Sequence, residues 1–197
     1  MIRSRLKPFV RRLFSGLVYY SGYCAWASRS AHILCYHDIT DHPASAFAVS
    51  TRDFAEQMRF LAESCVLVSV GQLVEMICQG QPIPPRAIAV TIDDGYLGVY
   101  TRAYPILKDY AVPATVFLPT RCLDGDGRRY APRDWAQAEF MTWDQARTMA
   151  VGGIAFGSHT LDHLSLPTLE PAQIMEQLVA SKARIEAEIG QQVAGFS

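Results

Sequence analysis

The stretch AIAVTIDDG, residues 87–95, decides how the rest of the chain is interpreted. Its first four residues form an apolar run that is typical of a buried strand. Asp93 and Asp94 therefore fall where the predicted strand ends. Two adjacent carboxylates repel each other, and partial burial increases the repulsion. A bound cation would remove this conflict, because one aspartate could ligate it while both stay ionised.

Strand-like and helix-like segments alternate on both sides of this stretch. Strands are predicted at 32–39, at the start of 66–80, and at 113–120, 154–160 and 193–197. Helices are predicted at 50–63, in the later part of 66–80, and at 97–111, 141–153 and 168–190. Repeated strand–helix units predict an α/β fold with a parallel sheet or barrel, whose functional groups lie at the C-terminal ends of the strands.

Two of the predicted helices have defined ends and faces. In 50–63, the predicted buried face consists of Phe54, Met58 and Leu61. In 168–190, Thr168 is the predicted cap, and the predicted shared face consists of Ile174, Leu178 and Ile185. Within 97–111, Pro105 predicts either a kink or a restart of the helix.

Charge divides the chain into two parts. Residues 1–30 carry six basic side chains and no acid, whereas residues 31–197 hold the other 12 basic residues against 19 acidic ones, a net charge of −7. The acidic body offers no basic stripe to neutralise phosphates, so nucleic acid is excluded as a partner. We therefore treat 1–30 as a basic and apolar N-terminal segment and 31–197 as the domain.

The N-terminal segment has three interpretations. A basic start, a short apolar region and the small-x-small sequence at 25–27 are typical of a leader peptide. Apolar residues at helical spacing within 1–27 also fit a helix lying on an anionic membrane surface. The third interpretation is a helix packed on the domain. Membrane proximity is favoured, which places the protein in a bacterial-type cell envelope, exported or membrane-associated, rather than the cytoplasm.

A second polar cluster, HTLDH, follows the predicted strand at 154–160. His159 and His163 are four residues apart, so a helical turn would place both imidazoles on one face. Two histidines and one carboxylate form a facial ligand set for a divalent transition metal. Thr160 stands where the HExxH pattern has its glutamate, so a base must come from elsewhere, and the aspartate pair can supply it.

Each of these motifs is a weak signal by itself, since DDG is frequent in turns and HxxxH often consists of surface or packing histidines. Asp162, between the histidines, is predicted to be a solvated or supporting group. His37 follows another predicted strand and is a further candidate site residue. Small apolar core positions are predicted for most of the cysteines, which include no CxxC pair: Cys24, Cys35, Cys65, Cys78 and Cys122.

Taken together, ILCYHDI, TIDDGY and IAFGSHTLDHLSL resemble, in order and spacing, the polysaccharide deacetylases of carbohydrate esterase family 4, the NodB-homology domain. The resemblance covers roughly residues 32–197. It implies a distorted (β/α) barrel that binds a divalent transition metal, with zinc favoured. The implied activity is the hydrolytic removal of N-acetyl or O-acetyl groups from an acetylated polysaccharide, which is the implied binding partner.

The resemblance also implies a role for individual residues. Asp94, His159 and His163 would be the metal ligands, and Asp93 would be the catalytic base that takes a proton from the attacking water. The backbone amide of Tyr96 would help to hold the oxyanion. His37 is placed with Tyr96 as an oxyanion or substrate contact.

The family pattern continues beyond the motifs present here. Its third motif, with an arginine and a proline-containing strand, is expected where the sequence reaches GFS at 195–197, and a later histidine supplies the general acid. We therefore interpret 31–197 as the N-terminal part of a deacetylase domain, an incomplete barrel. The alternative to an active enzyme is a truncated, non-catalytic remnant, or half of a split deacetylase, that binds only metal or glycan; the sequence does not identify a protein partner.

Overall fold

A computed structural model describes residues 30–43, 45–125 and 138–197 of the chain. The predictions for the basic N-terminal segment fall almost entirely on residues 1–29 and so lie outside the described residues. Within the described ranges, no helix is long and apolar enough to cross a membrane.

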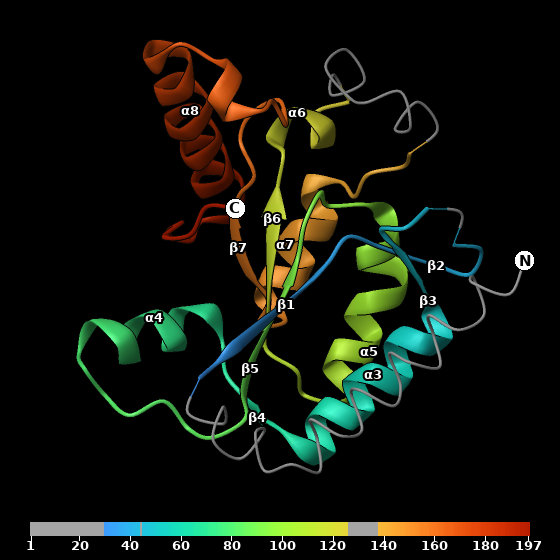
Figure 1. Cartoon of the computed structure of the whole chain (residues 1–197). Coiled ribbons are helices and arrows are strands. Elements are labelled where there is room, and N and C mark those ends of the chain that lie inside the picture. The colour runs from blue at the N-terminus through green and yellow to red at the C-terminus, as the bar shows by residue number, and fades with distance from the viewer. Residues whose placement is uncertain (1–29, 44, 126–137) are drawn as a thin grey trace, which may run out of the picture.

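A parallel sheet runs through the centre of the molecule (Figure 1). Its strands are arranged in the order β1 (His32–Tyr36), β5 (Ala87–Ile92), β6 (Ala114–Leu118) and β7 (Ala155–Ser158). The short β4 (Val66–Leu67) pairs with the start of β5. Both β5 and β6 are buried along their whole length, as expected for parallel strands covered on both faces. The predicted α/β class is confirmed, and the open parallel sheet is that of a partial, distorted (β/α) barrel.

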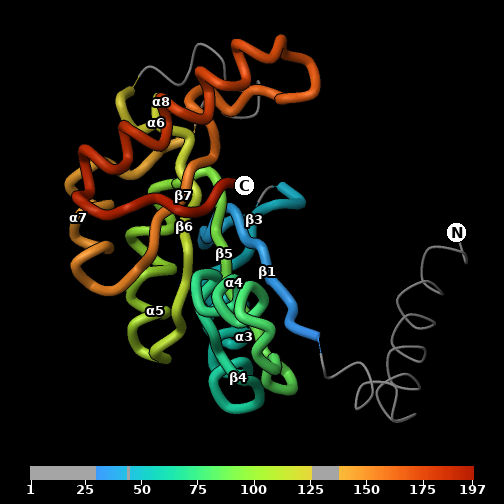
Figure 2. Tube along the Cα trace, turned by 90° about the vertical axis from the view of Figure 1, so that its left-hand side faces the viewer, coloured from blue at the N-terminus to red at the C-terminus, as the bar shows by residue number. Residues whose placement is uncertain are grey.

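The register of the sheet brings the C-terminal ends of its strands to one edge. Tyr36 pairs with Ile92, and Leu118 pairs with Ser158. Beyond β7, Ser158 forms a parallel bridge with Phe196, so the predicted strand at 193–197 does lie beside β7. Figure 2 shows this C-terminal segment passing close to β7 and β6. The residues that follow β1, β5 and β7 therefore meet at the same edge as the last residues of the chain.

Side chains alternate along β5 between two apolar clusters. Ile88, Val90 and Ile92 belong to the larger core, which also contains residues of α3, α5 and α7. Ala87 and Ala89 belong to a smaller cluster beneath α4. Successive side chains of a strand point to opposite faces, which explains why a wholly apolar strand serves two cores.

Helices surround the sheet, and several begin at caps that the sequence supplies. The helix α3 (Thr51–Ser64) is capped by Ser50 and buries Phe54, Met58 and Leu61, as predicted. Capping boxes start α4 (Val70–Cys78) and α7 (Trp143–Val151). The helix α3 packs against α5 (Tyr104–Asp109), and α7 packs against α8 (Pro171–Ile189). The remaining short elements are β2 (Asp38–Thr40), β3 (Ala48–Ser50) and α6 (Thr120–Leu123).

The segment around Pro105 forms two helices in succession. A π-helical stretch, η2 (Val99–Ala103), runs directly into α5, and Pro105 lies in the first turn of α5. Proline is tolerated in a first helical turn because it has no N–H to leave unpaired. Of the two possibilities that the sequence left open, the structure shows the restart.

The start and the buried face of α8 differ from the prediction. Its cap is Glu170, and Thr168 belongs to a short 3-10 turn, η5 (Leu166–Thr168). Pro171 explains the difference, because the residue before a proline avoids helical backbone angles and so becomes the cap. Of the predicted shared face, Ile185 is buried and Ile174 and Leu178 are half-buried, and the other two buried side chains are Gln177 and Ser181.

The packing at Gly98 yields a stability prediction. A Cβ atom there would lie 2.1 Å from the carbonyl oxygen of Ile39 and 2.9 Å from Oδ1 of Asp38. Because the nearer atom belongs to the backbone of a buried residue, Gly98→Ala is expected to lower the free energy of unfolding by about 1–3 kcal/mol. Urea unfolding monitored by circular dichroism measures the change.

Gly71→Ala is the matched control, since its Cβ would lie 3.8 Å from Ser69 Oγ, an ordinary contact. Alanine is the better helix former, so this variant should unfold at the same or a higher urea concentration. Equal unfolding midpoints for the two variants would contradict the tight contact at Gly98.

Candidate metal centre

Functional side chains gather where three strands of the sheet end. Asp93 and Asp94 follow β5, His159 follows β7, and His37 follows β1. Backbone hydrogen bonds extend the sheet at these ends. The N–H of Asp93 donates to the carbonyl of Tyr36 at 2.9 Å, and the N–H of His159 donates to that of Leu118 at 3.0 Å. The sheet edge thus fixes where these side chains start.

Asp94, His159 and His163 are brought together as the sequence predicted. One ligand atom from each lies within 4.8 Å of the others. The Nε2 atoms of His163 and His159 lie 3.2 and 3.6 Å from Oδ1 of Asp94. Nitrogen and oxygen ligands on one tetrahedral zinc ion are about 3.3 Å apart, given usual bond lengths near 2.0–2.1 Å. The observed separations suit a single small divalent ion.

The hydrogen bonding of His159 shows which ring nitrogen is available to a metal. Its Nδ1 lies 2.7 Å from the backbone carbonyl oxygen of Ser197. A carbonyl oxygen only accepts, so Nδ1 donates this hydrogen bond and Nε2 is the ring nitrogen turned toward Asp94. This arrangement is usual for metal-binding histidines, whose second nitrogen is held by a backbone carbonyl or a carboxylate.

The carboxylates of Asp93 and Asp94 each have an oxygen atom without a hydrogen bond. Asp93 and Asp94 are 6 % and 4 % exposed, and Oδ1 of each is buried without a hydrogen-bond partner. Buried carboxylate oxygens are costly to leave unpaired. Oδ1 of Asp94 faces the Nε2 atoms of both imidazoles, and a cation between these three atoms would satisfy the buried oxygen. The residues present fit a divalent metal.

The loop that carries the two histidines is not the helical turn that the sequence predicted. Thr160 and His163 have φ angles of 67° and 57°, which a right-handed helix cannot contain. Asp94, at φ 71°, is in the same left-handed region. Residues other than glycine rarely adopt these backbone angles, and residues with strained backbones cluster at functional sites. The imidazoles converge because the loop is bent at two points.

Buried polar contacts from α8 and α6 hold this loop in place. Oε1 of Gln177 accepts from the backbone N–H groups of Leu161 and Asp162 at 3.1 and 2.9 Å. Nε2 of Gln177 donates to Asp162 Oδ2 at 2.7 Å. The other carboxylate oxygen, Oδ1, pairs with Arg121 at 2.6 Å. Asp162 is thus a buried supporting group, and the solvated alternative is wrong.

Asp93 has a different set of neighbours from Asp94. Its Oδ2 atom accepts from Cys35 Sγ at 3.4 Å and from Ser197 Oγ at 3.3 Å. Its carboxylate lies within 4.8 Å of ligand atoms of Cys35 and His37. The ligand atoms near Asp93 and those near Asp94 come from different residues, so the two aspartates serve two separate groups of side chains.

The structure also places the two further candidates, His37 and Tyr96. His37 lies beside Asp93, and its ring contacts that of Phe47 at a centroid distance of 5.1 Å. Tyr96 forms an antiparallel bridge with Phe140, and the two rings stack at 5.4 Å. His37 therefore reaches the group around Asp93 directly, whereas the role of the Tyr96 amide stays a prediction.

Sequence reasoning missed Cys35. Cys122 is buried as predicted, but Cys35 and Cys78 are exposed and Cys65 is intermediate. Cys24 lies outside the described residues. The spacing of Cys35 could have identified it. Cys35 precedes His37 by two residues in an extended segment, so both side chains are expected on the same face of the strand.

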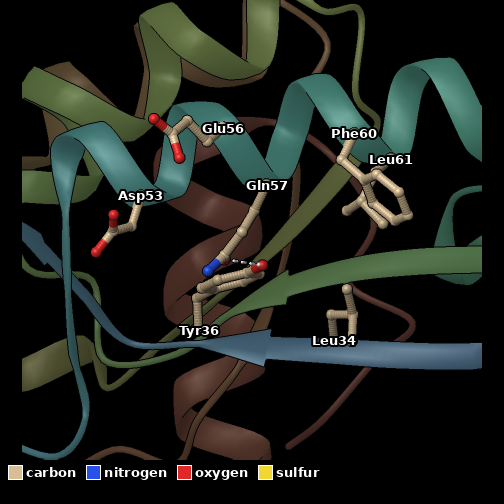
Figure 3. Close-up of a pocket in the computed structure, with 7 residues that line it drawn as sticks. All are labelled: Leu34, Tyr36, Asp53, Glu56, Gln57, Phe60 and Leu61. Atoms are coloured by element: carbon tan, nitrogen blue, oxygen red, sulfur yellow. Dashed lines mark hydrogen bonds between the residues drawn. The ribbon is translucent and has the colours of Figure 1, made fainter. Parts of the chain in front are cut away.

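A separate cavity of about 560 Å³ lies between β1 and α3. Figure 3 shows Asp53 and Glu56 near one end of it and Phe60 and Leu61 near the other, with Tyr36 Oη donating to Gln57 Oε1 at 2.8 Å. Its lining includes neither the aspartate pair nor the histidines. The cavity is therefore distinct from the candidate metal centre.

The fold and the convergent ligand atoms define a β/α protein with a candidate metal centre at the C-terminal edge of its sheet. The family model "Polysaccharide deacetylase" matches residues 80–197, more than half of the chain. The chain belongs to the polysaccharide deacetylase family, as its motifs predicted.

Two curated relatives and two solved structures illustrate the likeness. The Bacillus subtilis (strain 168) protein YxkH, a polysaccharide deacetylase by name, is 29 % identical over 166 residues, which are 84 % of this chain and 54 % of that protein. The poly-β-1,6-N-acetyl-D-glucosamine N-deacetylase of Escherichia coli (strain K12) is 31 % identical over 146 residues, which are 68 % of this chain and 21 % of that protein. The chain thus spans about half, or less, of these relatives.

Among solved structures, the Streptococcus pyogenes deacetylase PplD in complex with acetate superposes with a TM-score of 0.73 at 22 % identity, covering 84 % of this chain and 72 % of that one. IcaB from Ammonifex degensii superposes with a TM-score of 0.71 at 26 % identity, covering 85 % and 73 %. The first of these supports the fold alone, and the second agrees with the family assignment.

The support of the loop by Asp162 leads to a prediction about metal affinity. Asp162→Asn removes the charge that pairs with Arg121 while keeping the size of the side chain. Groups that orient metal ligands through hydrogen bonds are worth about 10–100-fold in affinity. Zinc affinity of the 197-residue protein, measured by competition with a chromophoric chelator, is expected to fall by that factor.

Glu63→Gln is the control, because Glu63 belongs to an exposed pair with Arg59 on α3 and surface pairs contribute little. Its zinc affinity should equal that of the unchanged protein. An Asp162→Asn variant that binds zinc with undiminished affinity would show that the loop does not depend on this ion pair.

Proposed function

We propose that this protein is a metal-dependent hydrolase that removes N-acetyl groups from a polysaccharide. The observation that carries the proposal is the meeting of Asp94, His159 and His163, with a second carboxylate, Asp93, next to Asp94 in the chain. Three ligands from the protein leave coordination positions for water and substrate, as in catalytic zinc sites. Family membership adds the type of reaction.

Asp94, His159 and His163 would hold the metal. When bound, a divalent ion supplies a Lewis acid that lowers the pKa of water and polarises the acetyl carbonyl. Asp93 has the position and the free oxygen to act as base: its Oδ1 atom is unpartnered, and Cys35 and Ser197 contact only Oδ2. It would take one proton from the attacking water as the oxygen adds to the acetyl carbon.

Among the residues that the structure describes, His37 is the candidate to complete the reaction. The carbon–nitrogen bond of the amide breaks only if the departing nitrogen receives a proton, because an amide anion is a poor leaving group. His37 lies beside Asp93 at the same edge of the sheet, and a protonated imidazole is a suitable donor near neutral pH. The products are acetate and a free amine on the sugar.

The substrate class is inferred from the family and its relatives. The Escherichia coli relative is named for a β-1,6-linked polymer of N-acetylglucosamine. An N-acetylated glucosamine polymer is therefore the first substrate to test, and it agrees with the cell-envelope location that the sequence favours.

The proposal is tested with two neighbouring substitutions. Asp94→Asn should lose the zinc equivalent that Asp94, His159 and His163 would hold and, with it, acetate release. Asp93→Asn should keep zinc bound but lower the rate of acetate release by about 10²–10⁴-fold, the usual contribution of a general base. Zinc is measured by mass spectrometry after gel filtration, and acetate is measured enzymatically from β-1,6-linked N-acetylglucosamine oligomers.

The wild-type chain discriminates between the main hypotheses. Bound zinc without acetate release from any acetylated glycan would favour the non-catalytic alternative, a remnant that binds metal or glycan only. A purified protein that binds no metal would remove the basis of the metal centre itself.

A second pair of substrates tests His37. His37→Gln is expected to lower kcat on the N-acetyl substrate by about 10²-fold or more, because the amine then leaves without a proton donor. On an aryl acetate, whose phenolate leaves unaided, the same variant should lose little. The exposed His42 provides the control, and His42→Gln should match the wild type on both substrates. Equal losses on amide and ester would show that His37 does not act as proton donor.

A further inference from the structure

A second set of potential metal ligands lies next to the first. Cys35, His37 and Asp93 offer a thiol sulfur, an imidazole nitrogen and a carboxylate oxygen, all within 4.8 Å of one another. The set is built by two paired strands: Cys35 and His37 come from the end of β1, and Asp93 follows β5, whose last residue pairs with Tyr36. It shares no residue with the candidate metal centre.

The geometry of this set suits a tetrahedral ion. Cys35 Sγ lies 3.4 Å from Asp93 Oδ2. Zinc bonds of about 2.3 Å to sulfur and 2.0 Å to oxygen place such ligands about 3.5 Å apart. Asp93 is 6 % exposed, and its Oδ1 atom is buried with no hydrogen-bond partner. An unpaired buried carboxylate oxygen is an independent sign that a positive charge belongs here.

The thiol gives this set a different metal preference from its neighbour. Sulfur ligands select thiophilic ions, whereas the first set contains only nitrogen and oxygen. Burial and the charge of Asp93 raise the pKa of Cys35 to about 11, so the thiol keeps its proton when no cation is present. A metal displaces that proton on binding, since the thiolate is the ligand.

We propose that Cys35, His37 and Asp93 form a second, thiolate-containing metal site, and that a thiophilic divalent ion bound there inhibits the enzyme. Inhibition follows because the site consumes the base and the proton donor of the proposed reaction. This second part rests on the proposed deacetylase function, whereas metal binding by the three side chains does not.

Cobalt titration of the metal-free 197-residue protein tests binding. Two equivalents of Co²⁺ are expected, and the second should produce a thiolate-to-cobalt charge-transfer band in the near ultraviolet. Cys35→Ser should bind one equivalent and lack the band. Cys78→Ser, which removes another exposed thiol at the end of α4, should retain both. The equivalent that remains in Cys35→Ser reports that the variant is folded.

A charge-transfer band that persists in Cys35→Ser, or a wild-type protein that binds a single equivalent, would overturn the proposal. Zinc inhibition is the second readout, with each protein normalised to its own rate at one equivalent of Zn²⁺. Excess Zn²⁺ should inhibit the wild type and Cys78→Ser at least 10-fold more strongly than Cys35→Ser, and equal inhibition of all three would refute the inhibitory role. A protein without deacetylase activity at one equivalent would refute the proposed function and leave the cobalt result standing.

Discussion

The structure depends on how the chain accommodates two buried carboxylates that are one peptide bond apart. Asp93 and Asp94 each retain a buried oxygen without a hydrogen-bond partner. Isolated buried charges are so unfavourable that they are normally paired, neutralised or bound to metal. The strand before them is apolar on both faces, so neither side chain can turn back into the core. Whatever stabilises the pair must therefore come from the neighbouring strand ends.

The neighbouring strand ends supply two different solutions. Asp94 faces two imidazoles from the loop after β7, whereas Asp93 faces a thiol and an imidazole from the end of β1. The left-handed conformation of Asp94 turns the chain directly after Asp93, and the two carboxylates belong to different groups of side chains. Strained backbone at Asp94, Thr160 and His163 is tolerated because buried contacts hold the surrounding segments.

Much of this arrangement could be predicted from the sequence, because it depends on local rules. Strand ends in a parallel sheet share an edge, so TIDDG and HTLDH had to meet, and the spacing of the histidines matched a ligand set. The face of α3 and the α/β class followed from periodicity in the same way. The left-handed turns within HTLDH could not be predicted, since a spacing of four residues is equally compatible with a helix.

The remaining differences arise from tertiary contacts that no local pattern encodes. Gln177 and Ser181 look like interruptions in an amphipathic helix, yet they are buried because polar groups at the end of β7 and in the loop after it require partners. From the sequence alone, Asp162 is easily taken for a solvated residue, because its partner Arg121 is 41 residues away. Cys35 became a candidate ligand only when β1 was placed beside β5. In each case the partner that explains the side chain's position belongs to an element that is distant in the sequence.

The two ligand sets also explain why a small change in metal content would have a large effect on this site. Asp93 can serve as a base only while its free oxygen is available, and that oxygen belongs to a carboxylate already in contact with Cys35. An ion at Asp94 would lower the electrostatic energy of the pair without occupying Asp93, the proposed base. An ion at Asp93 satisfies the same electrostatic demand but blocks the transfer. Asp94 is surrounded by two imidazoles, whereas Asp93 has a thiol and an imidazole beside it. These ligands therefore decide which ion relieves the repulsion between the carboxylates and whether the site remains able to react.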